Sequence, residues 1–213
     1  LAVLLKPGAA NLQETAGEIQ EAFVRAQEPG ALAAALAEAY GDLCRAAGVT
    51  KGAFFHHFES KEALGVAAAD YWSETTSALF AAAPYHAPKD PLARLLAYID
   101  FRKQLLQGET PDFTCLVGTM VQEAYDSNPA IRAACQASIF GHAETLEADI
   151  AEAKRTYTVK GRWSAKSLAL HTQAVIQGAF ILAKAEGGAA IAADTIDHLK
   201  RYVELLFQEK ANA

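Results

Sequence analysis

The segment formed by residues 42–64 reads DLCRAAGVTKGAFFHHFESKEAL and has the pattern of two helices joined by a tight turn. Gly48 suits a turn position that a β-carbon would disfavour, and the two alanines before it are small enough to let two helices cross closely. Phe54 and Phe58 are four residues apart, so they share one face of the second helix, where Val49 adds to the apolar side. The segment therefore predicts a helix-turn-helix unit.

The second helix of this unit begins at Thr50 and Lys51, and Thr50 can cap it. Backbone N–H groups and the helix dipole at such a start favour phosphate. In a DNA-reading unit of this kind the second helix enters the major groove by its N-terminal end. Ser60 can cap a further helix that begins at Lys61.

Residues 46–58, followed by residues 60–64, resemble the signature of the tetracycline-repressor (TetR) family. The resemblance implies an all-α fold, with a three-helix helix-turn-helix DNA-binding domain over residues 1–64 and a larger helical ligand-binding and dimerisation domain over residues 65–213. It also implies a homodimer that binds a palindromic double-stranded operator. A repressor of this kind is released from the DNA when a small-molecule effector fills the larger domain. The three cysteines, an odd number, suit a reducing cytoplasm, so we expect a cytoplasmic protein.

The same resemblance assigns DNA contacts to positions that match the recognition helix and the start of the next helix. These residues are Thr50, Lys51, Gly52, Phe55, His56 and Lys61. The alternative to DNA contact is that Thr50 only caps its helix and that Lys51 and Lys61 only lie on the solvated surface. Residues 31–40 depart from the family's pattern, because an alanine-rich stretch replaces the usual turn and capping residue.

Helical periodicity continues through most of the chain, and 52% of its 213 residues are hydrophobic, which is enough for a sizeable core. No stretch alternates over six residues, so we expect no sheet. We expect a linker at residues 84–91 and loops at 108–112 and 157–163. Beyond the helix-turn-helix, the expected helices are 61–82, 91–106, a helix to residue 126 capped by Thr114, 129–154, a helix to residue 185 capped by Ser164, and a last helix to residue 208 preceded by Asp194.

Other classes of protein receive little support from the composition. The net charge of −6 is weak evidence against DNA binding, because a reader needs only a local basic face. Cys44, Cys115 and Cys135 form no CxxC pair, and the adjacent His56 and His57 point about 100° apart on a helix, so we expect no metal and no cofactor. No catalytic signature is present, which argues against an enzyme. The apolar opening of five residues is too short for a membrane span, so no membrane partner is expected.

Large apolar residues are frequent between residues 92 and 154 and predict a ligand cavity in the larger domain. The candidate ligand contacts are Tyr98, Phe101, Phe113, Met120, Phe140 and His171, with Trp72, Phe80 and Phe180 as further candidates. The alternative is that most of them are ordinary core. Because these positions include no cluster of basic residues, we expect a mostly apolar effector.

Two apolar stripes near the C-terminus predict a four-helix dimer interface. They are Leu168, Val175, Ala179 and Leu182 on one helix, and Ile196, Leu199, Val203, Leu206 and Phe207 on the other, with Gly178 permitting close approach. The alternative is that both stripes face the chain's own core. Cys115 is a candidate redox or electrophile sensor, against the alternative of a buried small hydrophobe. The competing functions are a helical ligand-binding adaptor that has lost DNA binding, and a helical enzyme.

Overall fold

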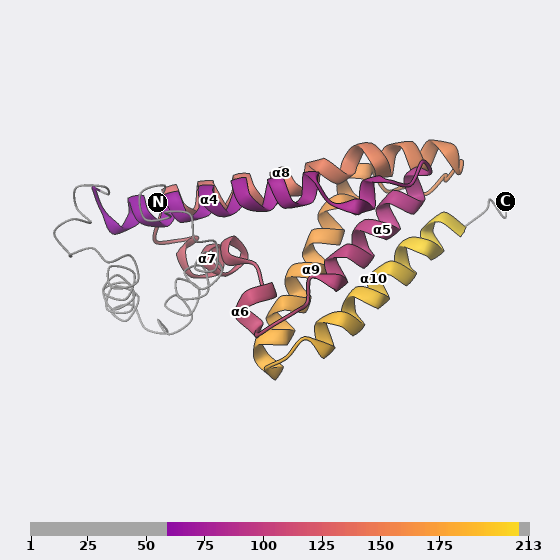
Figure 1. Ribbon diagram of the computed structural model, residues 1–213. Coiled ribbons are helices and arrows are strands. Elements are labelled where there is room, and N and C mark those ends of the chain that lie inside the picture. The colour runs from indigo at the N-terminus through magenta and orange to yellow at the C-terminus, as the bar shows by residue number, and fades with distance from the viewer. Residues whose placement is uncertain (1–58, 209–213) are drawn as a thin grey trace. The chain divides into compact units, whose positions relative to one another are not determined.

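The structure is a computed structural model that describes residues 59–208, and this part of the chain contains helices, turns and loops but no strand (Figure 1). Its elements are α4 (Lys61–Ala81), the 3-10 helix η1 (Pro84–His86), α5 (Pro91–Gln104), α6 (Thr110–Phe113), α7 (Leu116–Ala124), α8 (Pro129–Thr156), α9 (Ala165–Glu186) and α10 (Ala190–Gln208). The predicted all-helical fold class is confirmed. None of these helices is long and apolar enough to cross a membrane.

The described residues cluster into two compact units. The first contains residues 59–76 and 114–138, and the second contains residues 77–113 and 139–208. Both α4 and α8 contribute residues to each unit. The predicted domain boundary at residue 64 stays a prediction.

Local capping signals set where several helices begin. The Ser60 hydroxyl accepts a hydrogen bond from the backbone N–H three residues on, at 3.0 Å, at the start of α4. Ser164 caps α9 in the same way and forms a reciprocal capping box with Ser167. Both predicted caps are confirmed. Asp90 caps α5, and Pro91 follows it in the first turn, where the missing N–H costs nothing.

Two predicted helix starts are wrong, the first by one residue and the second by several. Cys115 rather than Thr114 caps α7, because its thiol accepts from the backbone N–H of Gly118 at 3.3 Å. The last helix begins at Ala190, so Asp194 lies inside it. Gly187, with a φ of 85°, ends α9 in the left-handed conformation. Only a few residues are then needed to connect α9 to α10.

The proline-rich segment 84–91 was predicted as a linker, but it is partly ordered and packs on the second unit. It contains η1, whose Tyr85 is buried and 6% exposed. The predicted loop at residues 108–112 likewise includes the start of α6. There the Asp112 carboxylate accepts from the backbone N–H of Glu109 at 2.8 Å.

In the first unit a glycine allows α4 and α8 to approach closely. A β-carbon added at Gly65 would lie 2.7 Å from Cδ1 of Ile131 and 3.9 Å from Cε of Met120. Met120 is completely buried there. The small residue on α4 therefore makes room for the core of this unit.

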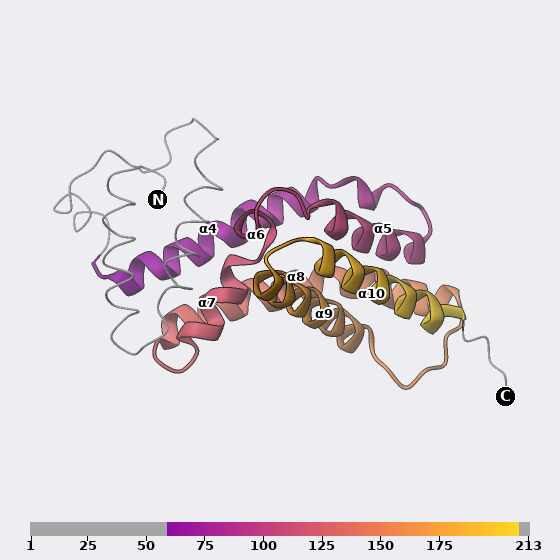
Figure 2. The ribbon, with the colours of Figure 1, turned by 90° about the horizontal axis from the view of Figure 1, so that it is seen from below.

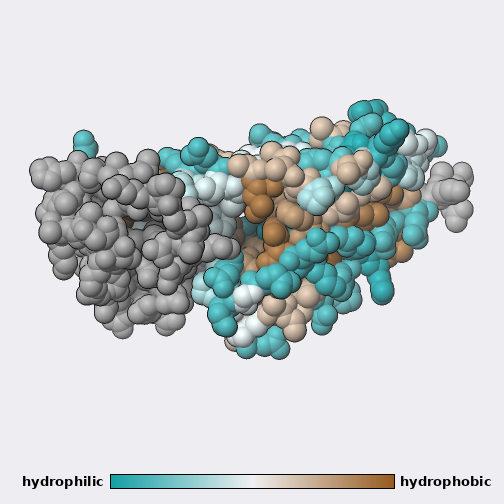
Figure 3. All heavy atoms as spheres, viewed as in Figure 1, coloured by the Kyte–Doolittle hydropathy of each residue, from teal (hydrophilic) through white to brown (hydrophobic). Residues whose placement is uncertain are grey.

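The second unit is built around α5, which packs against η1 and α10, while α10 packs against α9 (Figures 1 and 2). Leu95 and Ile99 on α5 are buried, as are Ile176 on α9 and Ile196 on α10. Figure 3 shows hydrophobic residues where α5 and α10 lie side by side, and hydrophilic residues over the C-terminal end of α8. This packing fixes the direction in which α5 presents its remaining side chains.

Ion pairs join α5 to its neighbours at the surface of the second unit. Lys103 pairs with Asp197 of α10 at 2.6 Å, and Asp100 pairs with Lys200 at 2.7 Å. The third cation, Arg94, donates to Asp149 and Glu152 of α8, both at 2.7 Å. These pairs range from part-buried to exposed; the exposed ones contribute little stability each, but together the pairs orient α5 against α8 and α10.

Candidate ligand-binding site

A buried hydrogen-bonded chain of three side chains lies at the centre of the second unit. Tyr98 of α5 is completely buried, and its hydroxyl lies 2.9 Å from Nε2 of His142 on α8. The side-chain amide of Gln173 on α9 donates to the same hydroxyl at 2.9 Å. The hydroxyl accepts from Gln173 and still has its own proton, which it can donate to His142 when Nε2 of the imidazole carries no proton.

Burial determines the charge of His142. Desolvation, and secondly the nearby Arg102 guanidinium, lower the pKa of His142 from 6.5 to about 4. The imidazole is therefore neutral at pH 7, and its Nε2 is free to accept the hydrogen bond from Tyr98. The Tyr98 hydroxyl and its two partners thus form a polar group without net charge inside an apolar unit.

Aromatic rings surround this polar chain. Phe80, near the end of α4, lies 4.5 Å from the ring of His142, 5.9 Å from that of Tyr98 and 5.7 Å from that of Phe101, all between ring centroids. Tyr85 of η1 meets Tyr98 edge to face at 5.3 Å. Burial, followed by the neighbouring Tyr98 and Asp149, raises the pKa of Tyr85 to about 12, so this phenol stays protonated. We call these rings together with His142 the aromatic cluster.

A cation lies at the edge of the aromatic cluster. The guanidinium carbon of the half-buried Arg102 is 5.1 Å from the ring centroid of Phe80 and 5.5 Å from that of Phe180 on α9. Phe180 in turn lies 6.4 Å from Phe113. Arg102 therefore joins the cluster to a second pair of buried rings through cation–π contacts.

The six predicted ligand contacts are not all in one place. Tyr98 and Phe101 belong to the aromatic cluster, and Phe113 reaches it only through Phe180 and Arg102. Met120 is a core residue of the first unit. Phe140 is 44% exposed, and the ring of the exposed His171 lies 5.0 Å from that of Tyr202, between centroids, at a tilted angle.

Sequence reasoning missed four residues in and around the aromatic cluster: Tyr85, Arg102, His142 and Gln173. The signal for Arg102 was its position one helical turn after Tyr98, since residues four apart share a helix face. Tyr85 was missed because its proline-rich surroundings suggested a linker. His142 and Gln173 carry no comparable local signal, because only the packing of α8 and α9 on α5 places them beside Tyr98.

The predicted DNA contacts Thr50, Lys51, Gly52, Phe55 and His56 lie outside the described residues, as does the histidine pair with His57. Lys61 is the first residue of α4. Between residues 59 and 208 no group of three or more histidine, cysteine or acidic side chains could hold a metal ion.

Most side chains of the two predicted dimerisation stripes are buried within the chain itself. Leu168, Ala179, Ile196, Leu199, Val203 and Phe207 are buried within the second unit. This corrects the assignment of these side chains to a partner, because α9 and α10 bury their stripes against the unit's own core. Apolar side chains on the same two helices remain exposed: Ile181, Leu182, Tyr202 and Leu205.

The two remaining cysteines in the described part of the chain differ in environment. Cys115 is partly exposed and caps α7, whereas Cys135 is completely buried. Burial, followed by the nearby Cys115, raises the pKa of Cys135 to about 11, so that thiol is protonated and unreactive at neutral pH. A sensor role for Cys115 stays a prediction.

The chain matches two families of protein segments. Residues 91–199 match the family described as tetracyclin repressor-like, C-terminal domain, and residues 39–68 match the bacterial regulatory proteins of the tetR family. A helical second domain behind such a segment defines a bacterial transcription regulator. The chain belongs to the TetR family.

Solved structures have a similar fold. A TetR transcriptional regulator from Chloroflexus aurantiacus is 26% identical, has a TM-score of 0.67, and is matched over 90% of this chain and 95% of its own. A TetR-family regulator from Cytophaga hutchinsonii is 24% identical, with a TM-score of 0.67 and coverage of 92% and 96%. One from Agrobacterium tumefaciens is 19% identical, with the same TM-score and coverage of 89% and 97%. No curated protein sequence matches the chain.

Proposed function

We propose that this chain is a homodimeric repressor that binds a palindromic operator and releases it when a small molecule binds at the aromatic cluster. We infer the effector site from the hydrogen-bonded side chains of Tyr98, His142 and Gln173, which lie among aromatic rings inside an apolar unit. A few convergent polar groups among aromatic side chains, one with a strongly shifted pKa, are typical of ligand sites. The alternative is an ordinary core, in which the same polar chain only fixes the packing of three helices.

The exposed apolar side chains of α9 and α10 support dimerisation. Leu182 is 44% exposed and Leu205 is 54% exposed. Gly178 has no atom within 4 Å of an added β-carbon, so a second helix can approach it closely. Positions 178, 181 and 182 share one face of α9, and 202 and 205 share one face of α10. A second copy of this chain, packed through the same face, would remove these side chains from water in a symmetric interface.

Phe80 supports a route from effector to DNA. This residue belongs to α4, a continuous helix that begins at Lys61, and its ring contacts His142, Tyr98 and Phe101. An effector that displaces Phe80 would shift α4 and so change the distance between the two recognition helices of a dimer. That distance must stay near one DNA turn, roughly 34–36 Å. Release requires the effector to bind the DNA-incompetent arrangement more tightly.

The test is fluorescence anisotropy with DNA from the region upstream of the gene, followed by a small-molecule screen for release. A repressor gives salt-dependent binding that selected compounds abolish in wild type. Phe80→Ala should bind the same DNA but respond less to those compounds. Ligand binding without any DNA binding would instead favour the adaptor, and turnover of a compound would favour an enzyme.

A further inference from the structure

Arg102 differs from the other cations of α5. The helix carries three, and two of them have carboxylate partners: Arg94 pairs with Asp149 and Lys103 pairs with Asp197. Arg102 has no ion pair and no hydrogen bond with any residue between 59 and 208, and its guanidinium instead lies over aromatic rings.

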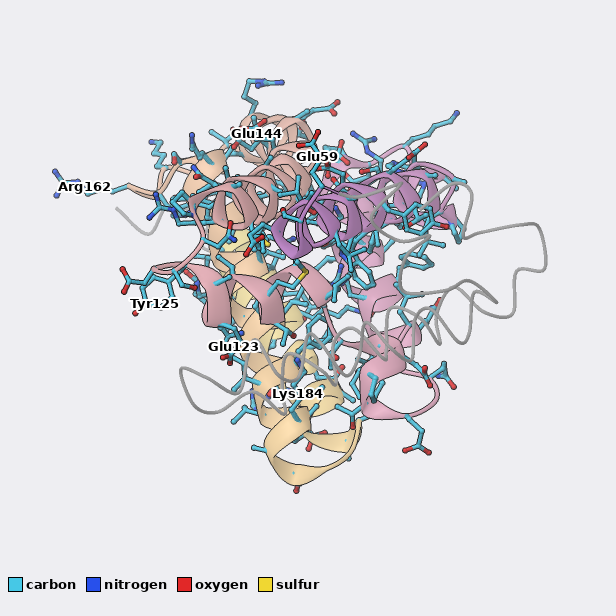
Figure 4. All side chains as sticks on the ribbon, turned by 90° about the vertical axis from the view of Figure 1, so that its left-hand side faces the viewer. Glu59, Glu123, Tyr125, Glu144, Arg162 and Lys184 are labelled. Carbon is cyan, nitrogen blue, oxygen red and sulfur yellow. The ribbon has the colours of Figure 1, made fainter. Side chains whose placement is uncertain are left out.

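The position of Arg102 is also unlike that of a surface cation. Arg162, in the loop before α9, is exposed and points away from the helices (Figure 4). The Arg102 guanidinium instead lies half-buried between the rings of Phe80 and Phe180. The ring contacts compensate part of the cost of removing it from water. They leave its N–H donors without a carboxylate, which is the group that the planar, forked guanidinium binds best.

The titratable groups near this guanidinium supply no opposing charge that is not already paired. His142 is neutral at pH 7, the Tyr85 phenol is protonated, and Asp149 is engaged by Arg94. The aromatic cluster therefore carries one positive charge that the described protein does not balance. Phe80, Phe180 and Phe113 supply apolar surface on both sides of it.

We propose that the effector is an apolar carboxylate, whose acid group pairs with Arg102 while its aromatic or aliphatic body packs on Phe80 and Phe180. This inference rests on the proposed effector site in the second unit and names the ligand class of that site. It also refines the expectation of a mostly apolar effector, because it places one anionic group at one end of the molecule.

The experiment compares acids with their neutral amides by titration calorimetry at pH 7 on the purified full chain without DNA. The probes are benzoate, 2-naphthoate, 4-phenylbutyrate and decanoate, each paired with its primary amide. Wild type should bind at least one acid roughly tenfold or more tightly than its amide, since hydrogen bonds to charged groups are the stronger kind. Arg102→Met should bind acid and amide alike, whereas Arg102→Lys should keep part of the preference.

Lys103→Met is the matched control, because it removes the adjacent cation of the same helix and should leave the acid preference unchanged. Equal binding of acid and amide by wild type, no binding by any acid, or a preference that persists in Arg102→Met would overturn the proposal. Where Arg102→Met fails to fold, the wild-type comparison and Arg102→Lys decide.

Failure of this proposal is distinguishable from failure of the proposed function. An Arg102-dependent acid preference in a protein that binds no DNA would support the ligand class and contradict the repressor. Release of operator DNA by neutral compounds alone, with no acid bound, would support the repressor and contradict the ligand class.

Discussion

The Tyr98 hydroxyl lies 2.9 Å from Nε2 of His142 and accepts a hydrogen bond from Gln173 at the same distance. These two contacts tie α8 and α9 to α5 through a single buried oxygen atom. Gln173 is buried and His142 is half-buried, so removal of that oxygen leaves both polar groups without this partner.

Tyr98→Phe should therefore destabilise the protein by about 1–3 kcal/mol, because it removes the hydrogen-bond partner of the buried Gln173 and the half-buried His142. The measurement is urea unfolding at pH 7. Tyr202→Phe is the control: Tyr202 is 44% exposed, and its hydroxyl bonds to no other residue among 59–208, so the change should stay within about 0.5 kcal/mol. Equal effects of the two substitutions would contradict a special role for the Tyr98 hydroxyl.

Stability should fall as the pH drops from about 6.5 to about 4, in part because of His142. Its pKa is lowered to about 4 in the folded state, so between these values the unfolded chain binds the proton more readily. The contribution is complete above pH 6.5 and amounts to at most roughly 3 kcal/mol.

His142→Gln removes this titration, so the difference in unfolding free energy between wild type and variant should shrink as the pH falls. Urea unfolding at several pH values measures it, and the use of a difference cancels the titration of carboxylates common to both proteins. A difference independent of pH would show that His142 titrates normally.

Lys51→Ala and Lys61→Ala should each weaken binding to all DNA sequences and lower the salt slope of log K by about one. The reason is that each lysine is proposed to neutralise one phosphate. Anisotropy titrations at several salt concentrations give the slope. Unchanged operator affinity in the double variant would remove both lysines from the DNA interface.

Leu182→Lys combined with Leu205→Lys should convert a dimer into a monomer, because charges would replace apolar side chains at the centre of the proposed interface. Sedimentation velocity at micromolar concentration measures the state. Leu79→Lys on α4 is the control, since Leu79 is 47% exposed and outside this face. A wild type that sediments as a monomer would contradict the interface itself.

Operator DNA and effector should weaken each other's binding by the same factor, because the coupling free energy is a property of both ligands together. Titration of a compound found by the release screen, with and without operator, gives one factor, and DNA titration with and without the compound gives the other. Equal compound affinity in both titrations would rule out the proposed switch even if both ligands bind well.

The prediction from sequence succeeded where the controlling interactions are local. Ser60 and Ser164 were identified as caps because a hydroxyl bonds to an N–H only three residues away. The boundaries that failed depended on neighbours. Asp194 has the chemistry of a cap, but Gly187 ends the preceding helix early enough for α10 to begin before it.

The sequence by itself determined the helical class, most helix positions and the family, because periodicity, capping and the segment of residues 46–64 are all properties of short stretches. Only the tertiary structure decided that Tyr98, His142 and Gln173 meet, since they lie on three helices and are brought together by packing. Tertiary structure also decided which faces of α9 and α10 are exposed. An apolar stripe has the same sequence pattern whether it contacts its own core or a partner, and only the neighbouring helices distinguish the two.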